Sequence, residues 1–355
     1  MFSGLPFSFL FLMVMFFGTM FSLSSFHWLG VWAGLEINLV GFLPILMYQK
    51  NMLESESAVK YFIIQALGSS FLMFGSLLSY SLTFSWESLS QSFMGLSFGS
   101  QLLVLGLLMK MGVFPFHFWL PSVMAGLSWL SCLLLATWQK VAPIFLMVAM
   151  LDSKLFYMSF LLLCLMSAGS SLVSGLGGMN QTQIRALLAY SSIGHLGWIL
   201  FASCFSEISM KIYFSIYVMI SICMFSSLWT LDSKDMKNLA SLGKSSSSSI
   251  FSFMILLLSF GGLPPFLGFI SKWTAINSAV NTSPRIILFL LILGSLMSLF
   301  YYLNLFFSQI LTMKFNFVTS FNLGTWNLGV QKSFILLINL VGGIILILFL
   351  PMNFL

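Results

Sequence analysis

The chain has 355 residues, of which 59% are apolar and only 6% are charged. The mean hydropathy of +1.04 excludes an ordinary soluble domain, in which roughly a quarter of the residues would be charged. A membrane-spanning helix needs about 20 apolar residues, so the composition predicts an all-α, polytopic transmembrane bundle. The net charge of +6 comes from scattered lysines and arginines. These form no basic patch of the kind that binds nucleic acid.

The apolar runs between polar breaks predict eleven membrane spans. In chain order they cover about residues 5–25, 27–48, 58–82, 99–119, 126–150, 155–177, 182–205, 209–231, 249–274, 284–313 and 332–351. Between the third and fourth spans, Trp86, Leu89, Phe93 and Leu96 have helical spacing. This spacing predicts a short helix in the membrane interface at 83–98. The charged, serine-rich connection at 232–249 predicts a solvated loop.

Helix-breaking residues interrupt the fourth and the ninth of these spans. Pro115 lies in the fourth, and the sequence Gly-Gly-Leu-Pro-Pro at 261–265 lies in the ninth. Freed backbone groups at membrane depth are tolerated only inside protein or beside water. Because the two spans are five apart, a five-span repeat would be inverted, as in many transporters. We expect one membrane domain with repeats at about 1–150 and 151–314, followed by a connecting segment and last span at 315–355.

Four charged residues, Glu36, Lys110, Lys140 and Lys272, lie within predicted spans and beyond the first few residues of each span. A charge at bilayer depth costs at least about 2.5 to 3.5 kcal/mol, which favours a functional role. We expect Glu36 and Lys110 to form an ion pair, which suits either a structural or a proton-relay role. Lys140 lies too near the middle of its span to reach the interface, whereas Lys272 lies nearer an end. A snorkelling side chain is therefore the alternative interpretation of Lys272.

Histidines and hydroxyl groups supply further candidates. His195 lies in mid-span with Ser191 and Ser192 one turn before it, which suits a proton relay and a hydrogen-bonded packing histidine equally. His117 follows the break in the fourth span and is predicted to hold that turn. Lys60 opens the third span, either at the interface or at the entry of a proton path. The accessory candidates are Lys60, His117, Ser191, Ser192 and Tyr190.

The sequence carries no motif for a cofactor or a metal. The four cysteines lie in apolar runs without C-x-x-C spacing, so they are predicted to be packing residues. No Walker A motif or dinucleotide fingerprint occurs. The histidines do not pair at one depth on facing spans as haem ligands would. We therefore expect neither a cofactor nor a metal ion in this chain.

The basic residues in the connections and at the ends of the spans divide unequally between the two sides of the membrane. The side with the N-terminus takes eight, Lys50, Lys60, Arg185, Lys234, Lys237, Lys244, Lys314 and Lys332. The other side takes three, Lys154, Lys211 and Arg285. Because basic loops stay inside, the N-terminus is predicted to be inside. An odd number of spans then places the C-terminus outside.

Five segments that contain these residues resemble the antiporter-like membrane subunits of mitochondrial NADH:ubiquinone oxidoreductase, respiratory complex I, and among them the chain 2 family. They are WAGLEINL at 32–39, KMGVFPFHFWLP at 110–121, TWQKVAP at 137–143, NQTQIRALLAYSSIGHLGW at 180–198 and GLPPFLGFISKW at 262–273. These subunits are related to Mrp-type cation/proton antiporters. The resemblance implies inverted five-helix repeats, eleven spans and no redox centre.

The resemblance also implies roles for single residues. Glu36 and Lys110 become the buried acid–lysine pair, Lys140 the central lysine, and Lys272 the lysine of the second broken helix. His195 falls between Lys140 and Lys272. The chain would be a proton-translocating subunit in the mitochondrial inner membrane, with its N-terminus in the matrix and its C-terminus in the intermembrane space. NADH, FMN, iron–sulfur clusters and ubiquinone would be bound by other subunits, and the partners would be other membrane-arm subunits and lipid.

Two alternatives stay open at the level of sequence. A free-standing cation/proton antiporter would share the broken helices and the buried lysines, and only its assembly state would differ. A purely structural membrane subunit would use the same charges to pack the bundle. Substitution of the central lysine separates this last interpretation from a pumping role.

Overall fold

The computed structural model describes residues 7–47, 51–79, 96–152, 157–231, 247–264, 266–280, 285–312 and residue 339. Every regular element in these ranges is an α-helix, as the composition predicts. The chain divides into two compact units, Met1–Met166 and Ser167–Leu355, and the boundary falls within helix α8. Each unit is described separately below.

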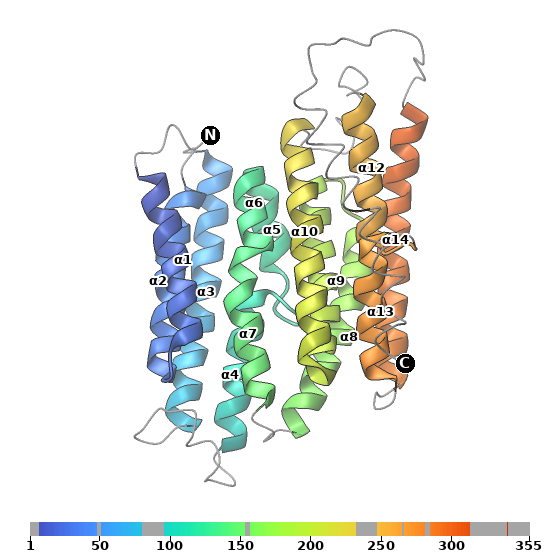
Figure 1. Cartoon of the computed structure of the whole chain (residues 1–355). Coiled ribbons are helices and arrows are strands. Elements are labelled where there is room, and N and C mark those ends of the chain that lie inside the picture. The colour runs from blue at the N-terminus through green and yellow to red at the C-terminus, as the bar shows by residue number, and fades with distance from the viewer. Residues whose placement is uncertain are drawn as a thin grey trace. The chain divides into compact units, whose positions relative to one another are not determined.

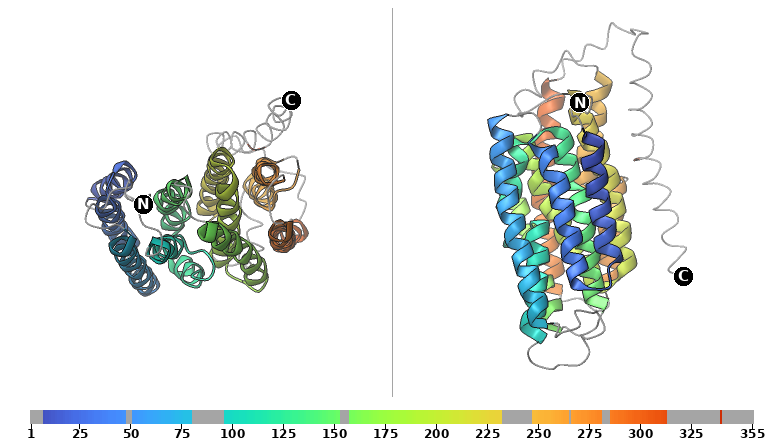
Figure 2. Two further views of the ribbon diagram at one scale, coloured as in Figure 1. Left: turned by 90° about the horizontal axis from the view of Figure 1, so that it is seen from below. Right: turned by 90° about the vertical axis from the view of Figure 1, so that its left-hand side faces the viewer.

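The first unit is built from long helices packed along one another, with short helices between them (Figure 1). Its helices are α1 (Ser8–Ser24), α2 (Trp28–Leu46), α3 (Met52–Ser79), α4 (Leu96–Met111), α5 (Trp119–Gly126), α6 (Trp129–Ala136), α7 (Trp138–Asp152) and the first part of α8 (Tyr157–Met179). The closest pairs are α1 with α2 and α3 with α4, and the view along the helix axes shows them side by side (Figure 2). Helix α7 packs against α1, α4 and α6. These contacts surround the cavity described in the next subsection.

The second unit has the same all-helical construction. After the rest of α8 come α9 (Ile184–Phe205), α10 (Glu207–Leu231), α12 (Ser247–Gly261), α13 (Leu267–Ala279) and α14 (Arg285–Thr312). Helix α10 packs against α9, α12 and α13, and α14 packs against α9 and α12. Helix α9 is the most buried of these helices, because nearly every residue from Ala186 to Ser203 is enclosed. It therefore supplies the core of this unit.

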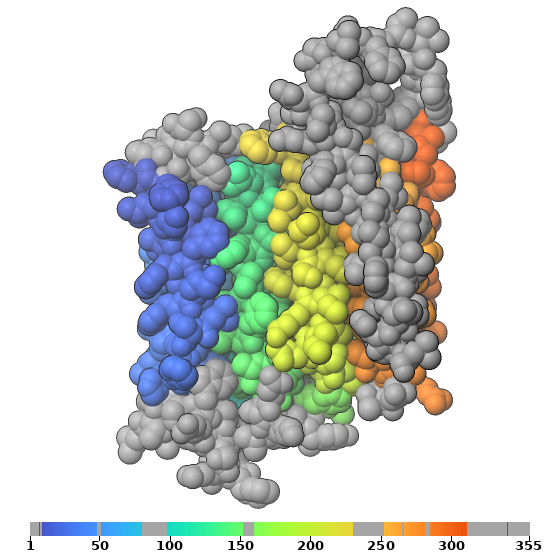
Figure 3. Space-filling model, viewed as in Figure 1, coloured from blue at the N-terminus to red at the C-terminus, as the bar shows by residue number. Residues whose placement is uncertain are grey.

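The helices carry the surface of a membrane protein. Among the described residues, seven helical segments are long and apolar enough to cross a bilayer, and three shorter apolar helices accompany them. Large apolar side chains such as Phe62, Phe74 and Met219 are exposed on the outside of α3 and α10. In the space-filling view, α1 (dark blue) and α10 (yellow) each present an outer face (Figure 3). The protein is a multi-pass membrane protein, since water would not tolerate so much exposed apolar surface.

Helix α4 ends in the middle of the predicted fourth span. Gly112 has a φ of 74°, and its N–H donates to the Met109 carbonyl at 3.2 Å. The N–H of Val113 donates to the Leu108 carbonyl at 3.2 Å, which completes a Schellman C-cap. The chain becomes helical again only at Trp119. The glycine therefore ends the helix three residues before Pro115, the residue that marks the break in the sequence.

Helix α12 ends with the same cap. Gly262 has a φ of 75° and donates to the Ser259 carbonyl at 3.1 Å, while Leu263 donates to the Leu258 carbonyl at 3.3 Å. Helix α13 then starts at Leu267. A residue with a side chain is strained at such a φ, so glycine is required at both positions. Two helices in separate units are thus interrupted by one local mechanism.

Some predicted boundaries were wrong. The predicted span 126–150 does correspond to an apolar helical segment at Trp129–Leu151, which a single turn residue, Thr137, divides into α6 and α7. Helix α3 begins at Met52, before the predicted start at 58, since its first turn is polar and the apolar run alone does not define the helix. Helix α13 continues to Ala279, beyond the predicted end at 274. The predicted segments at 83–95 and 232–246, and 332–351 apart from residue 339, lie outside the described residues.

Candidate functional site

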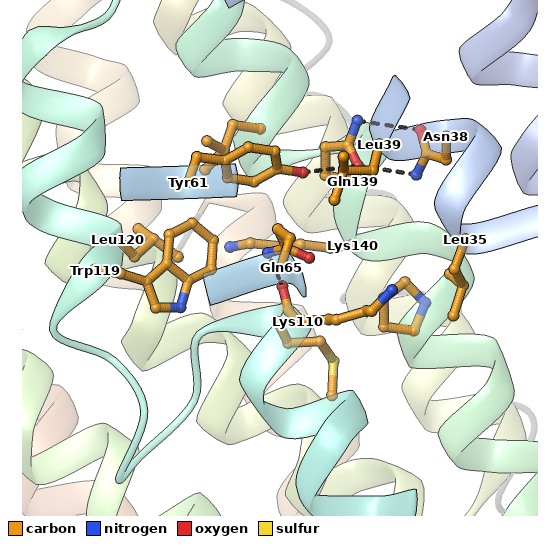
Figure 4. Close-up of a pocket in the computed structure, with 13 residues that line it drawn as sticks. Leu35, Asn38, Leu39, Tyr61, Gln65, Lys110, Trp119, Leu120, Gln139 and Lys140 are labelled. Atoms are coloured by element: carbon orange, nitrogen blue, oxygen red, sulfur yellow. Dashed lines mark hydrogen bonds between the residues drawn. The ribbon is translucent and has the colours of Figure 1, made fainter. Parts of the chain in front are cut away.

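A small cavity lies among helices α2 to α7 of the first unit. It brings together two of the charged residues predicted from the sequence, Lys110 and Lys140 (Figure 4). Its other lining residues are Leu35, Asn38, Leu39, Tyr61, Gln65, Met111, Trp119, Leu120, Leu135, Gln139 and Pro143. Two buried lysines at one cavity are costly unless they have partners or can lose their protons.

Glu36 and Lys110 form the ion pair predicted from their positions. The Lys110 ammonium lies 3.9 Å from Oε1 of Glu36, which is too long for a direct hydrogen bond. Lys110 is buried, whereas the Glu36 side chain is 28% exposed at the edge of the unit. Lys110 also occupies the last turn of α4, where the helix dipole favours a positive charge. The Glu36 carboxylate is thus the less tightly held member of the pair, because it makes no direct hydrogen bond to Lys110.

The break after α4 leaves carbonyl groups without helical partners. Gln65 of α3 supplies one replacement, because its amide donates to the Lys110 carbonyl at 3.2 Å. The side chain of Gln65 is buried and lines the same cavity as Lys140. The end of α4 is therefore fixed by a neighbouring helix, and Lys110 is fixed with it.

Lys140 is 2% exposed and lies near the start of α7. The helix is interrupted just before Lys140, at Thr137, and Pro143 follows Lys140 by three residues. Pro143 has no N–H for the carbonyl of Gln139, so this turn of the helix lacks a backbone hydrogen bond. No Asp or Glu is among the residues that line the cavity with Lys140. The lysine lies deep inside the unit, as predicted.

Three polar residues around Lys140 are absent from the sequence prediction. Asn38 and Gln139 donate to each other's carbonyl oxygens at 2.9 and 3.2 Å, and the Tyr61 hydroxyl makes a longer contact of 3.4 Å with Gln139. Figure 4 shows these three side chains beside Lys140. A search for charges in apolar runs misses neutral amides, although Gln139 is adjacent to Lys140 in the sequence.

A second small cavity lies within the second unit. It brings together His195 of α9 and Lys272 of α13, both predicted from the sequence. Hydroxyl groups surround them, and the other lining residues are Ser171, Ser174, Ser191, Gly194, Trp198, Phe260, Gly294, Ser295, Ser298, Tyr301 and Tyr302. Such a lining can accept and donate hydrogen bonds at many points, so it suits water and proton transfer.

Lys272 turns back across the break in the predicted ninth span. Its ammonium donates to the carbonyl of Gly261 at 2.8 Å, at the C-terminal end of α12. An ideal Cβ on Gly262 would lie 2.9 Å from this ammonium nitrogen. The side chain therefore reaches into the helix break, which favours a position inside the unit over the snorkelling alternative. The C-terminal end of a helix carries partial negative charge, which stabilises the lysine there.

His195 is enclosed by aromatic side chains. Its Nδ1 lies 3.1 Å from the Tyr213 hydroxyl of α10, and the rings of Tyr217 and Phe260 lie within 5.3 Å of its own. Ser191 donates its hydroxyl to the Leu188 carbonyl of the same helix. Tyr213, which the sequence analysis missed, is thus a direct partner of the histidine ring. Its spacing of four residues from Tyr217 on one helix was the available signal.

The other accessory candidates lie in ordinary structural settings. Lys60 is exposed and pairs with Glu56 at 2.6 Å one turn earlier in α3, which fits the interfacial interpretation. His117 is buried, and its Nδ1 lies 3.2 Å from the Pro115 carbonyl, so it holds the turn as predicted. Ser192 donates to the Ala189 carbonyl of its own helix. Tyr190 is partly exposed, and its ring lies directly against Gly177, where a side chain would clash with it.

Comparison with curated proteins finds close relatives. The chain is 42% identical to NADH-ubiquinone oxidoreductase chain 2 of Lumbricus terrestris, over 82% of this chain and 83% of that one. It is 41% identical to the protein of the same name from Anopheles gambiae, over 84% of each chain.

Solved structures agree in fold. A chain of respiratory complex I from Thermus thermophilus with bound aureothin superposes with a TM-score of 0.82 at 26% identity, covering 97% of this chain and 79% of that one. A chain of the Mrp complex from Dietzia sp. DQ12-45-1b shares the fold with a TM-score of 0.76 at 17% identity, covering 84% and 59%. Residues 25–298 match the model of the family described as NADH:quinone oxidoreductase/Mrp antiporter, TM. The chain belongs to this family.

Proposed function

We propose that the chain is a proton-translocating subunit in the membrane arm of respiratory complex I. The observation that carries the proposal is the placement of Lys110, Lys140, His195 and Lys272 at two enclosed polar cavities. The chain bearing them is 42% identical to a subunit of NADH-ubiquinone oxidoreductase. NADH, FMN, iron–sulfur clusters and ubiquinone are bound by other subunits of the complex, and this chain contributes no redox centre. Its partners are the neighbouring membrane-arm subunits and lipid.

The proposed mechanism is electrostatic. Electron transfer elsewhere in the complex changes the charge near Glu36 and Lys110, whose contact of 3.9 Å is loose enough to open. Separation of this pair changes the field at Lys140, which responds by gaining or losing a proton. The step continues through His195 and water to Lys272. Lysine suits this task because it can release its proton when buried, whereas arginine stays charged.

We further propose eleven spans arranged as two inverted five-helix repeats, at about 1–150 and 151–314. The three shorter apolar helices and the run at 332–351 would complete the eleven. The matching C-caps at Gly112 and Gly262 support the repeat, because each unit contains one helix broken in the same way. The remaining residues, about 315–355, form the connecting segment and the last span.

The chain is placed in the mitochondrial inner membrane, with its N-terminus in the matrix and its C-terminus in the intermembrane space. The excess of basic residues in the loops on the N-terminal side supports this orientation. Protease added to the matrix side of inverted vesicles should therefore cleave the connection at 232–249. Cleavage of this connection in intact mitoplasts would reverse the topology.

Assembly provides the test of the function. We expect the chain to migrate on a native gel with a very large complex that oxidises NADH, because its buried charges need partner subunits to remain stable. The measurement is an in-gel stain for NADH oxidation together with an antibody against this chain. A stable chain that runs alone and exchanges Na⁺ for protons in liposomes would instead establish a free-standing antiporter.

The contact between His195 and Tyr213 supplies a prediction about the relay. The change Tyr213→Phe removes the hydroxyl 3.1 Å from Nδ1 and leaves the aromatic packing in place. We expect NADH-driven proton uptake to fall by about tenfold, with normal assembly, because the histidine ring loses the hydrogen bond that orients it. Tyr217→Phe is the matched control. Tyr217 lies on α10, as Tyr213 does, and its ring lies 5.2 Å from that of His195. Equal effects of the two changes would assign His195 to packing.

A further inference from the structure

A reciprocal amide pair connects helix α2 to helix α7 inside the first unit. Nδ2 of Asn38 donates to Oε1 of Gln139 at 2.9 Å, and Nε2 of Gln139 donates to Oδ1 of Asn38 at 3.2 Å. Asn38 is 4% exposed, and both side chains line the cavity of Lys110 and Lys140 (Figure 4). Each amide thus satisfies one donor and one acceptor of the other, where water would otherwise be needed.

The two amides lie close in sequence to two of the charged residues of the proposed path. Asn38 follows Glu36 by two residues on α2, and Gln139 immediately precedes Lys140 on α7. The pair therefore joins the helix of the acidic residue to the helix of the central lysine. The turn that holds Gln139 and Lys140 lies between the break at Thr137 and Pro143. Because Pro143 cannot donate to the Gln139 carbonyl, this turn has less backbone support and depends more on its side-chain contacts.

We propose that the Asn38–Gln139 pair is a positioning device that couples α2 to Lys140. When the Glu36–Lys110 pair opens, any displacement of α2 reaches the start of α7 through these two hydrogen bonds. Two neutral amides suit this task, since they give directed bonds between helices without adding a charge. A carboxylate in place of Gln139 would hold Lys140 in its charged form. The inference rests on the proposed proton-translocating function and assigns it two further residues.

The test uses three variants in the assembled complex. The double variant Asn38→Leu with Gln139→Met removes both amides together, so neither amide leaves the other unsatisfied, and the Tyr61 hydroxyl loses its longer contact of 3.4 Å with Gln139. Folding should therefore be preserved. The exchange variant Asn38→Gln with Gln139→Asn keeps the combined side-chain length and the reciprocal bonding. Thr137→Val is the matched control, because the Thr137 hydroxyl is buried nearby but bonds its own helix, to the Leu133 carbonyl at 2.8 Å.

For each variant, the abundance of the complex on a native gel and the initial rate of NADH-driven proton uptake in vesicles are measured. We expect the double variant to assemble normally and to pump about tenfold more slowly, the loss expected when about two interhelical hydrogen bonds are removed. The exchange variant should recover most of the rate, and Thr137→Val should pump normally.

Several outcomes would overturn the inference. Normal pumping by the double variant would show that Lys140 needs no link to α2, and failure of the exchange variant to pump would exclude reciprocal pairing. Loss of assembly in the double variant alone would make the pair structural. The proposed function is judged separately, because it predicts that Lys140→Met stops pumping in the assembled complex. If Lys140→Met stops pumping and the double variant does not, only the amide coupling fails.

Discussion

Replacement of Lys140 by arginine is expected to stop proton translocation although the positive charge is kept. Arginine is similar in length, but it does not release its proton at any accessible pH. A side chain that transfers protons contributes about 10²-fold or more to rate, so NADH-driven proton uptake should fall at least this far. Because pumping and electron transfer are coupled, NADH-dependent quinone reduction should slow as well. NADH oxidation by hydrophilic acceptors should survive, since the proposed function assigns that reaction to other subunits.

The companion change Lys140→Met distinguishes a relay from a structural ion. Methionine removes the charge and should also stop proton uptake, yet it should disturb assembly less than arginine because it removes a buried ion. A purely structural lysine predicts the reverse order, with arginine tolerated and methionine disruptive. Proton uptake per NADH and the abundance of the complex on a native gel measure both effects. Normal pumping by Lys140→Arg would remove Lys140 from the proposed path.

The second large effect is expected at Gly262, which ends α12. The change Gly262→Ala places a side chain at a φ of 75°, at a cost of about 1 to 2 kcal/mol. The new Cβ would also lie 2.9 Å from the Lys272 nitrogen and 3.0 Å from Cδ and Cε. We expect this contact to move the lysine from the Gly261 carbonyl and to reduce proton uptake per assembled complex by about tenfold or more.

Two other glycines at the ends of α12 and α4, Gly261 and Gly112, serve as controls. Gly261→Ala should be tolerated, because its Cβ would meet Tyr302 at 3.7 Å in ordinary contact. Gly112→Ala imposes the same backbone strain at a φ of 74°, but its Cβ would meet Leu120 at 2.9 Å instead of a lysine. Gly112→Ala should thus lower thermal stability with a smaller loss of proton uptake per complex. Equal losses at Gly112 and Gly262 would attribute the effect to backbone strain alone.

The sequence was sufficient to find the charged members of both cavities. Lys110, Lys140 and Lys272 are conspicuous because charges are rare in apolar runs, and helix-breaking residues lie near two of them. The Glu36–Lys110 contact could be predicted because few other charges were available at that depth. The structure brings these residues to the two cavities, while their roles in proton transfer stay predictions.

The neutral members of the site could not be predicted in the same way. Asn38 and Gln139 are separated by 101 residues along the chain, and their contact depends on how α2 and α7 pack. Tyr213 reaches His195 from another helix for a similar reason. Amides and tyrosines occur throughout membrane helices, and a local signal such as the four-residue spacing of Tyr213 and Tyr217 does not say which residue of another helix is the partner. Their pairing is a property of tertiary structure.

The helix breaks show which local signals decide a boundary. Pro115 correctly marks an interrupted span, but the helix ends at Gly112 because a glycine at positive φ closes the C-cap first. The break at Thr137 has neither glycine nor proline beside it. There the Thr137 hydroxyl donates to the Leu133 carbonyl and caps the end of α6, a bond that depends on side-chain geometry.

The hydrogen bond from Lys272 to the Gly261 carbonyl has a consequence for how the side chain would respond to gain or loss of a proton. A protonated lysine has three N–H groups and a neutral one has two. One N–H therefore remains for the carbonyl in either state, so the side chain can release and regain a proton without changing its conformation. Lys110 differs, because its partner is the carboxylate of Glu36, whose attraction vanishes when the lysine is neutral. In the proposed path, the Lys272 side chain can stay in place when its charge changes, whereas the Lys110 side chain is released from Glu36 when it becomes neutral.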